Sequence, residues 1–236
     1  MPPGNTQLQL EPDFPARGTL AQVEAQLLGR TNKAYPPVWL SLSVPKNSDE
    51  IPSFIDAALE AKTVLEVSSQ PALWGNRLRH ENAELIISGG QDLEVATDEK
   101  HAADLTQAHL LQLLSSLGHE GIEFYFLKVK RALEEFQIAG AFAALEAARQ
   151  EGHIAHLGLW VAGPALAVLP VWQFHDAFEV VLLNNEARTT LATLATERRV
   201  GVVVHGDDRP TGATWLAPVN SAKEIREAVS VQVATP

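Results

Sequence analysis

Eight short apolar segments alternate with helical patterns along this chain, and that alternation constrains its fold more than any other feature. Runs of apolar and β-branched residues between turn signals are typical of strands. Strands that alternate with helices form parallel sheets. Eight of them in such regular order predict a closed (β/α)8 or TIM barrel. The expected strands are Val38–Val44, Thr63–Ser68, Leu85–Ser88, Ile122–Lys128, Ile154–Trp160, Phe178–Leu183, Val200–His205 and Thr214–Val219.

Two connections between these strands are short. Only residues 206–213 separate the seventh strand from the eighth, whereas a parallel crossover usually takes a dozen residues or more. Eight extended residues reach about 27 Å, which is enough to return along a six-residue strand of about 20 Å. A bare loop can therefore make the connection. Residues 69–83 leave room for one short helix, so we expect outer helices that are short or absent after strands 2 and 7.

The composition is that of one globular domain. Residues 1–20 are rich in Pro, Gly and Gln and are interpreted as a flexible arm, and residues 21–236 as a single TIM-barrel domain. The net charge of −11 argues against nucleic acid or an anionic membrane as a partner, because no basic excess can displace phosphate counterions. No run approaches the roughly 18 apolar residues of a membrane span, and the N-terminus lacks a signal-peptide core. We expect a cytoplasmic protein.

Metal and thiol chemistry find little support in the sequence. The chain has no cysteine, which excludes disulfides, thiolate catalysis and Cys-ligated zinc. His153 and His156 flank a helix end and a strand start, and this pair supplies too few ligands for a metal. His205 with Asp207 and Asp208 is interpreted as an acidic turn. We therefore expect no metal site.

Four segments, in the right order, resemble the aldo-keto reductases. LLSSLGHEGIEFYFLK (113–128) is similar to the family's SLKRLGTDYIDLYLLH, and ALEAARQEGHIAHLGLW (144–160) is similar to ALEELVKEGKIRAIGVSN. LLGRTN (27–32) resembles the opening LGRTG, and PVNSAKEIREAV (218–229) resembles PGASSPEQLEENL. The resemblance implies a divergent, shortened member of this superfamily of TIM barrels, which reduce carbonyls with NADPH.

The positions of the family's catalytic residues carry other residues here. The family uses a Tyr as proton donor, a Lys and an Asp that tune the Tyr, and a His that orients the substrate. Glu66 stands at the Asp position, Lys128 at the His position and Gly89 at the Lys position. Trp74, followed by Gly75, looks like the Tyr–Gly pair, although it falls three residues later than the family's spacing, which points to Pro71.

The positions that hold the cofactor in the family also differ. Trp160 and Val161 stand where the family's Ser-Asn pair holds the nicotinamide carboxamide, and Leu182 replaces a Gln. Asn220 replaces the basic residue that binds phosphate, while Ser221 is kept. The resemblance therefore implies that standard NADPH binding is lost, and we expect no cofactor.

Candidate site residues follow from the fold, because TIM-barrel sites lie at the C-terminal ends of the strands. Glu66 and Lys128 form the sharpest candidate pair. Burial lowers the pKa of a Lys and a nearby carboxylate opposes that shift, so Lys128 could act as acid, base or Schiff-base nucleophile. A purely structural ion pair is the alternative. The candidate ligand-binding residues are Ser88, Trp160, Asn185, His205, Asn220 and Ser221.

Three functional hypotheses remain open. The first is a barrel that has lost NADPH-dependent carbonyl reduction and binds a small ligand or a protein partner. The second is a divergent NADPH-dependent oxidoreductase with a rearranged site, in which Lys128 donates the proton. The third is a lyase that uses Lys128 as a Schiff-base lysine. We also expect a homodimer, because crossovers without a helix would leave the outer wall of strands seven and eight apolar and exposed.

Overall fold

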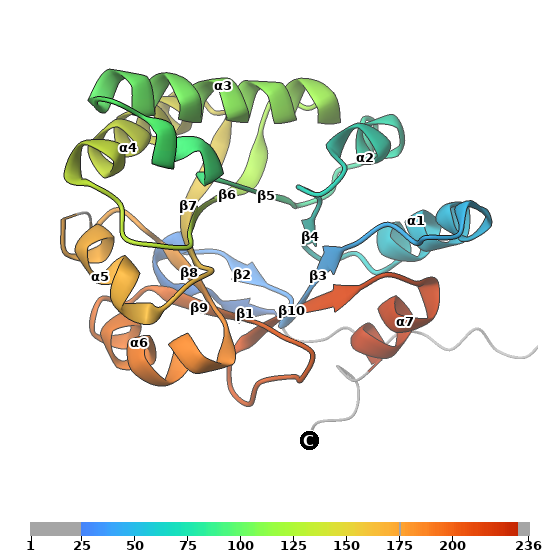
Figure 1. Ribbon diagram of the computed structural model, residues 1–236. Helices are drawn as coiled ribbons and strands as arrows, with labels where there is room; N and C mark the ends of the chain where they lie inside the picture. Colours follow the sequence, from blue (N-terminus) through green and yellow to red (C-terminus); the bar gives the residue numbers. More distant parts are fainter. Residues whose placement is uncertain (1–24, 175, 231–236) are drawn as a thin grey trace, which may run out of the picture.

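The computed structural model describes residues 25–174 and 176–230, and it confirms the closed barrel (Figure 1). Parallel pairing runs in the order β10-β3-β4-β5-β6-β7-β8-β9. The flexible arm expected at residues 1–20 lies outside the described residues. The barrel strands are β3 Val38–Leu42, β4 Leu65–Glu66, β5 Leu85–Gly89, β6 Ile122–Val129, β7 Ile154–Val161, β8 Val180–Leu183, β9 Gly201–His205 and β10 Thr214–Val219.

Helices surround the barrel as the alternation predicts, with α3 and α4 packed side by side (Figure 1). Asp98 begins α3 by accepting a hydrogen bond from the His101 N–H, and Gly118 ends it in the left-handed conformation. The α-helices are α1 Ile51–Glu60, α2 Pro71–Leu78, α3 Glu99–Leu117, α4 Glu135–Gln150, α5 Ala165–Phe174, α6 Asn185–Glu197 and α7 Ala222–Ser230; short 3₁₀ turns span Gly29–Thr31, Ser48–Glu50 and Gln91–Val95.

The reduced outer layer is confirmed at both predicted places. Helix α2 has eight residues, and residues 206–213 form bends and turns without a helix. The outer wall beside that loop is nevertheless covered. Trp215 is 9% exposed and its indole N–H donates to the Gly206 carbonyl at 2.7 Å, while Val204 is fully buried. The exposed wall on which the homodimer was predicted is therefore not found at β9 and β10.

A small hairpin at the N-terminal end of the barrel was not predicted from the sequence. It pairs β1 (Gln26–Leu27) with β2 (Ala34–Tyr35) in antiparallel register. Arg30, in the connecting turn, donates to the main-chain carbonyl of Asp176 at 2.6 Å and to that of Phe178. The hairpin thereby fastens the LLGRTN segment to the start of β8.

Aromatic rings fill the N-terminal half of the barrel interior. Tyr35 and Trp39 pack against Phe124, with ring centroids 5.2 and 5.1 Å from it. Phe126 lies one layer above, and a Cβ at Gly158 would stand 2.4 Å from its ring. Only glycine leaves room there for the phenyl group. The opposite, C-terminal half of the interior receives polar side chains instead.

Candidate functional site

Strand alternation sends one set of polar residues into the barrel mouth. Ile86, Phe126 and Val203 belong to the inner core cluster, and successive side chains of a strand point to opposite faces. Residues two positions further along therefore also point inward, at the C-terminal end where TIM-barrel sites lie. These residues are Ser88 on β5, Lys128 on β6 and His205 on β9; Trp160 on β7 belongs to the same inner cluster.

Lys128 lies on the face of an indole ring. Lys128 and Trp160 are direct partners in the β6–β7 register, and the ammonium nitrogen stands 3.8 Å from the ring centroid. This is a cation–π contact. Burial lowers the pKa of Lys128, the charge of Glu66 opposes that shift, and Lys130 adds to it. The side chain therefore gives up its proton more readily than an exposed lysine.

Glu66 is held by its own neighbours rather than by Lys128. It is 5% exposed and accepts hydrogen bonds from the Ser41 hydroxyl and the Ser68 N–H, both at 3.2 Å. Within residues 25–174 and 176–230, no ion pair joins Glu66 to Lys128. The structural ion pair considered from the sequence is therefore not formed. The two groups share the mouth, and the charge of Glu66 acts on Lys128 without direct contact.

His205 and Ser88 complete the mouth. The His205 ring centroid lies 5.7 Å from that of Trp160. Burial lowers the pKa of His205, the charge of Lys128 lowers it further, and Asp207 opposes both. Ser88 is 3% exposed, and its N–H donates to the Ser68 hydroxyl at 2.7 Å. The mouth thus contains an amine, a carboxylate, an imidazole, hydroxyl groups and an indole ring.

Two of the predicted catalytic positions do not lie in the mouth. Trp74 belongs to α2 in the outer layer, where it is fully buried with its ring 5.8 Å from that of Phe54. Gly89 faces away from the barrel axis, because a Cβ there would stand 2.0 Å from the Tyr125 hydroxyl and 2.5 Å from the His109 ring. A side chain at Gly89 would enter the β5–α3 interface, so this position cannot hold a lysine in the mouth.

The remaining ligand-binding candidates lie at helix starts. Asn185 is the first residue of α6 and is exposed; its neighbour Asn184 caps the helix by accepting from the Ala187 N–H at 2.6 Å. Asn220 is exposed, and its N–H donates to the Glu224 carboxylate at 2.8 Å. Ser221 accepts from the Glu224 N–H at 3.3 Å. A carboxylate therefore already occupies the start of α7.

Sequence reasoning missed Ser41 and Glu224, and it placed Asn184 at a strand end without identifying it as the cap of α6. A signal existed for Ser41, because it is the one polar residue of β3 and stands two positions after the inward Trp39. Asn184 could have been recognised as a helix cap after a buried strand. Glu224 lies three residues after Ser221, which is the spacing of a capping box.

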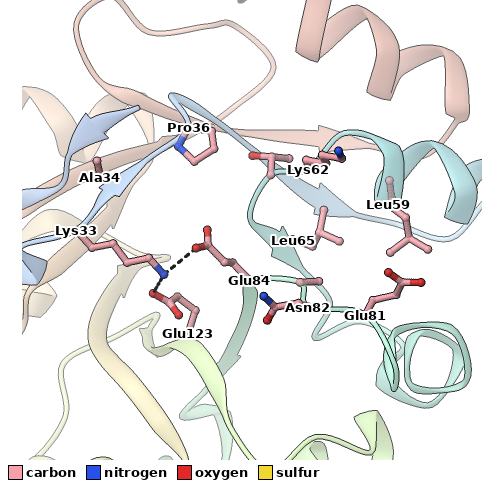
Figure 2. Close-up of a pocket in the computed structure, with 13 residues that line it drawn as sticks. Lys33, Ala34, Pro36, Leu59, Lys62, Leu65, Glu81, Asn82, Glu84 and Glu123 are labelled. Carbon is pink, nitrogen blue, oxygen red and sulfur yellow. Dashed lines mark hydrogen bonds and ion pairs between the residues drawn. The ribbon is translucent and has the colours of Figure 1, made fainter. Parts of the chain in front are cut away.

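A cavity of about 650 Å³ lies at the opposite end of the barrel, beside the β1–β2 hairpin (Figure 2). Its polar wall is an ion-pair network in which Lys33 bridges Glu84 at 2.7 Å and Glu123 at 2.8 Å. Tyr35 also donates to Glu123. Ion pairs at the N-terminal end of a TIM barrel serve stability rather than chemistry, so the mouth remains the candidate site.

Searches for metal clusters and membrane helices found neither in the part of the chain that the structure describes. No group of three or more His, Asp or Glu residues there could hold a metal ion. No helix there is long and apolar enough to cross a membrane.

Comparisons with known proteins show the fold. No protein-family model and no curated protein matches the sequence. The holo form of an aldo-keto reductase from Bacillus halodurans matches with a TM-score of 0.72 and 15% identity, over 91% of this chain and 92% of that one. A Bombyx mori aldo-keto reductase in complex with NADP matches with a TM-score of 0.66 and 14% identity, over 89% and 87%. The aldose reductase from Schistosoma japonicum gives 0.65 and 12%, over 87% and 85%. The chain therefore has the aldo-keto reductase barrel fold, as its four sequence segments predict.

Proposed function

We propose that this aldo-keto reductase-like barrel binds a small ligand in its mouth and does not perform NADPH-dependent carbonyl reduction. The contact between Lys128 and Trp160 carries the proposal. It places an indole and an ammonium group at the end of β7, where the family holds the nicotinamide ring with a Ser-Asn pair. The mouth thereby offers one cation, one carboxylate and several hydroxyls to a small polar molecule.

The residues present do not fit the family's cofactor. Trp160 offers an indole face where a carboxamide needs hydrogen-bonding side chains. At the start of α7, the Asn220 N–H is already bonded to Glu224, and that negative charge repels a phosphate group. The connection at 206–213 is a short loop without a helix. These three observations, taken together, support loss of the NADPH site.

Two enzymatic alternatives use the same lysine. A divergent oxidoreductase would hold NADPH differently and use Lys128 as proton donor. The Bombyx mori protein, which shares this fold, was solved in complex with NADP, and this supports the alternative. A lyase would use Lys128 as a Schiff-base nucleophile, which its lowered pKa favours.

The first experiment is a titration with NADPH followed by tryptophan fluorescence. Trp160 lies in the mouth and Trp74 in the outer layer. Saturable quenching at micromolar NADPH that disappears in Trp160→Phe, but persists in Trp74→Phe, would establish cofactor binding and refute the proposal. An unchanged signal up to millimolar NADPH is the expected result.

A turnover assay complements the titration. Small aldehydes are incubated with NADPH and the purified chain, with the Glu66→Ala, Lys128→Ala double variant as the matched control. We expect equal rates for the two proteins. Steady NADPH consumption by the unaltered chain above the rate of the double variant would favour the oxidoreductase.

The assembly and location of the protein are part of the same proposal. We propose a cytoplasmic homodimer, although the exposed wall expected at β9 and β10 does not supply its interface. Light scattering at micromolar concentration measures the mass, and a monomer mass would refute the dimer.

A further inference from the structure

Among the residues that the structure describes, the ammonium group of Lys128 lies against an indole ring and not in an ion pair. Lys33, Lys100 and Lys223 each form an ion pair with a carboxylate. Over residues 25–174 and 176–230, Lys128 has no such partner, and its nitrogen rests on the Trp160 ring instead. The indole face attracts the ammonium form, but burial without a carboxylate partner disfavours that charge and lowers the pKa of Lys128. The surroundings of Lys128 therefore suit a nucleophilic amine.

Groups that can carry protons surround this amine. Glu66 enters the mouth from β4, where Ser41 and the Ser68 N–H fix its carboxylate. His205 enters from β9, beside the same indole ring as Lys128. Addition of an amine to a carbonyl needs an acid that delivers a proton to the oxygen and a base that removes one from nitrogen. The mouth holds both kinds of group.

From this arrangement we propose that Lys128 captures a small aldehyde or ketone as an imine. The inference rests on the proposed ligand-binding mouth and names the chemical class of its ligand. The amine lone pair attacks the carbonyl carbon, and the oxygen takes a proton to become a hydroxyl. The nitrogen loses a proton, and the hydroxyl takes a second proton and leaves as water while a C=N bond forms. The nitrogen then releases its remaining proton, which gives the neutral imine. Amine and carbonyl give imine and water, so no oxidant or reductant is required.

The size and polarity of the ligand follow from the walls of the mouth. Aromatic side chains fill the barrel below, with Trp39, Phe124 and Phe126 fully buried. The carbonyl compound must therefore be short. Hydroxyl groups of Ser41 on β3 and Ser88 on β5 also enter the mouth and suit a ligand that carries a hydroxyl or carboxylate next to its carbonyl.

Reductive trapping tests the inference on the full chain. The protein is incubated separately with pyruvate and with glycolaldehyde in the presence of cyanoborohydride, and the products are analysed by intact mass and peptide mapping. We expect a single adduct on Lys128, with a mass gain equal to the carbonyl compound less one oxygen atom. Lys128→Arg keeps the positive charge over Trp160 but forms no adduct. Lys130→Arg, two residues further along, is the matched control and labels like the unaltered chain.

The pH dependence of trapping separates Lys128 from surface lysines. The charged and titratable groups that act on Lys128 and its neighbour His205 are Glu66, Lys130 and Asp207. Labelling of Lys128 is expected to persist to lower pH than labelling of the exposed Lys100. Glu66→Gln is expected to slow trapping at least tenfold while leaving the fold intact, as measured by circular dichroism.

Labelling of Lys128 and fluorescence of Trp160 together distinguish covalent capture from non-covalent binding. Adducts spread evenly over exposed lysines, or none on Lys128, would overturn the imine. If the same carbonyl compounds still change Trp160 fluorescence saturably, the mouth binds its ligand without covalent capture, and only the further inference fails. If they leave that fluorescence unchanged and Lys128 unlabelled, the carbonyl class is refuted, and the proposed function then depends on ligands of other chemistry.

Discussion

Replacement of Gly89 by alanine tests whether the strand position aligned with the family's lysine faces the outer layer. The new Cβ would stand 2.0 Å from the Tyr125 hydroxyl and 2.5 Å from the His109 ring. Tyr125 is fully buried, so neither it nor the strand can move freely. Overpacking of this kind costs about 1–3 kcal/mol.

The same substitution also disrupts a buried hydrogen bond. The Tyr125 hydroxyl and the His109 Nδ1 are 3.0 Å apart, and such a bond contributes about 1 kcal/mol. We therefore expect Gly89→Ala to lower the free energy of unfolding by about 2–4 kcal/mol, measured by urea denaturation. Gly206→Ala is the control, because its Cβ would meet only the Asn185 amide at 3.5 Å.

A double variant sharpens the test. Tyr125→Phe removes the nearest atom of the clash, so it should restore part of the stability lost in Gly89→Ala, with a coupling of about 0.5–3 kcal/mol. If Gly89→Ala costs no more than Gly206→Ala, Gly89 does not face Tyr125. A lysine at this position could then reach the mouth.

Three further predictions concern the mouth and its supports. The pKa of His205 is lowered from 6.5, so the unfolded chain binds a proton at this residue before the folded chain does as the pH falls. The stability that neutral His205 contributes is therefore present above about pH 6.5 and lost below it. Urea titrations from pH 8 to 5 should show a smaller fall in the free energy of unfolding for His205→Gln than for the unaltered chain. Asn184→Ala removes the α6 cap and should cost about 1 kcal/mol; an unchanged urea midpoint would contradict the cap. Gly89→Lys should give no NADPH-dependent turnover of small aldehydes, and a measurable gain in rate would show that the ammonium reaches the mouth.

The alternation of apolar segments was enough to predict the barrel, because each buried parallel strand is bounded by turn signals and each except β9 is followed by a helix. The bare connection at 206–213 followed from chain length alone. The second strand was predicted over Thr63–Ser68, whereas β4 spans Leu65–Glu66. There the Ser68 N–H donates to the Glu66 carboxylate instead of to a neighbouring strand.

The catalytic positions were harder to predict, because a shift of one residue moves a side chain to the other face of a strand. Gly89 was placed by analogy one residue beyond the inward Ser88, and it therefore faces α3 rather than the mouth. Trp74 was placed by its resemblance to a Tyr–Gly pair, but it belongs to α2 and packs on Phe54. Glu66, Lys128, Trp160 and His205 lie in the mouth because each falls at or next to the C-terminal end of its strand, on the inward face.

The aromatic filling of the lower barrel has a consequence for how such a protein can evolve. Tyr35, Trp39, Phe124 and Phe126 place large buried rings of the barrel interior at the end away from the mouth. Mutations in the rim at the other end therefore leave most of that stabilising contact intact. A protein with this architecture can exchange one set of reactive groups in its mouth for another while it stays folded.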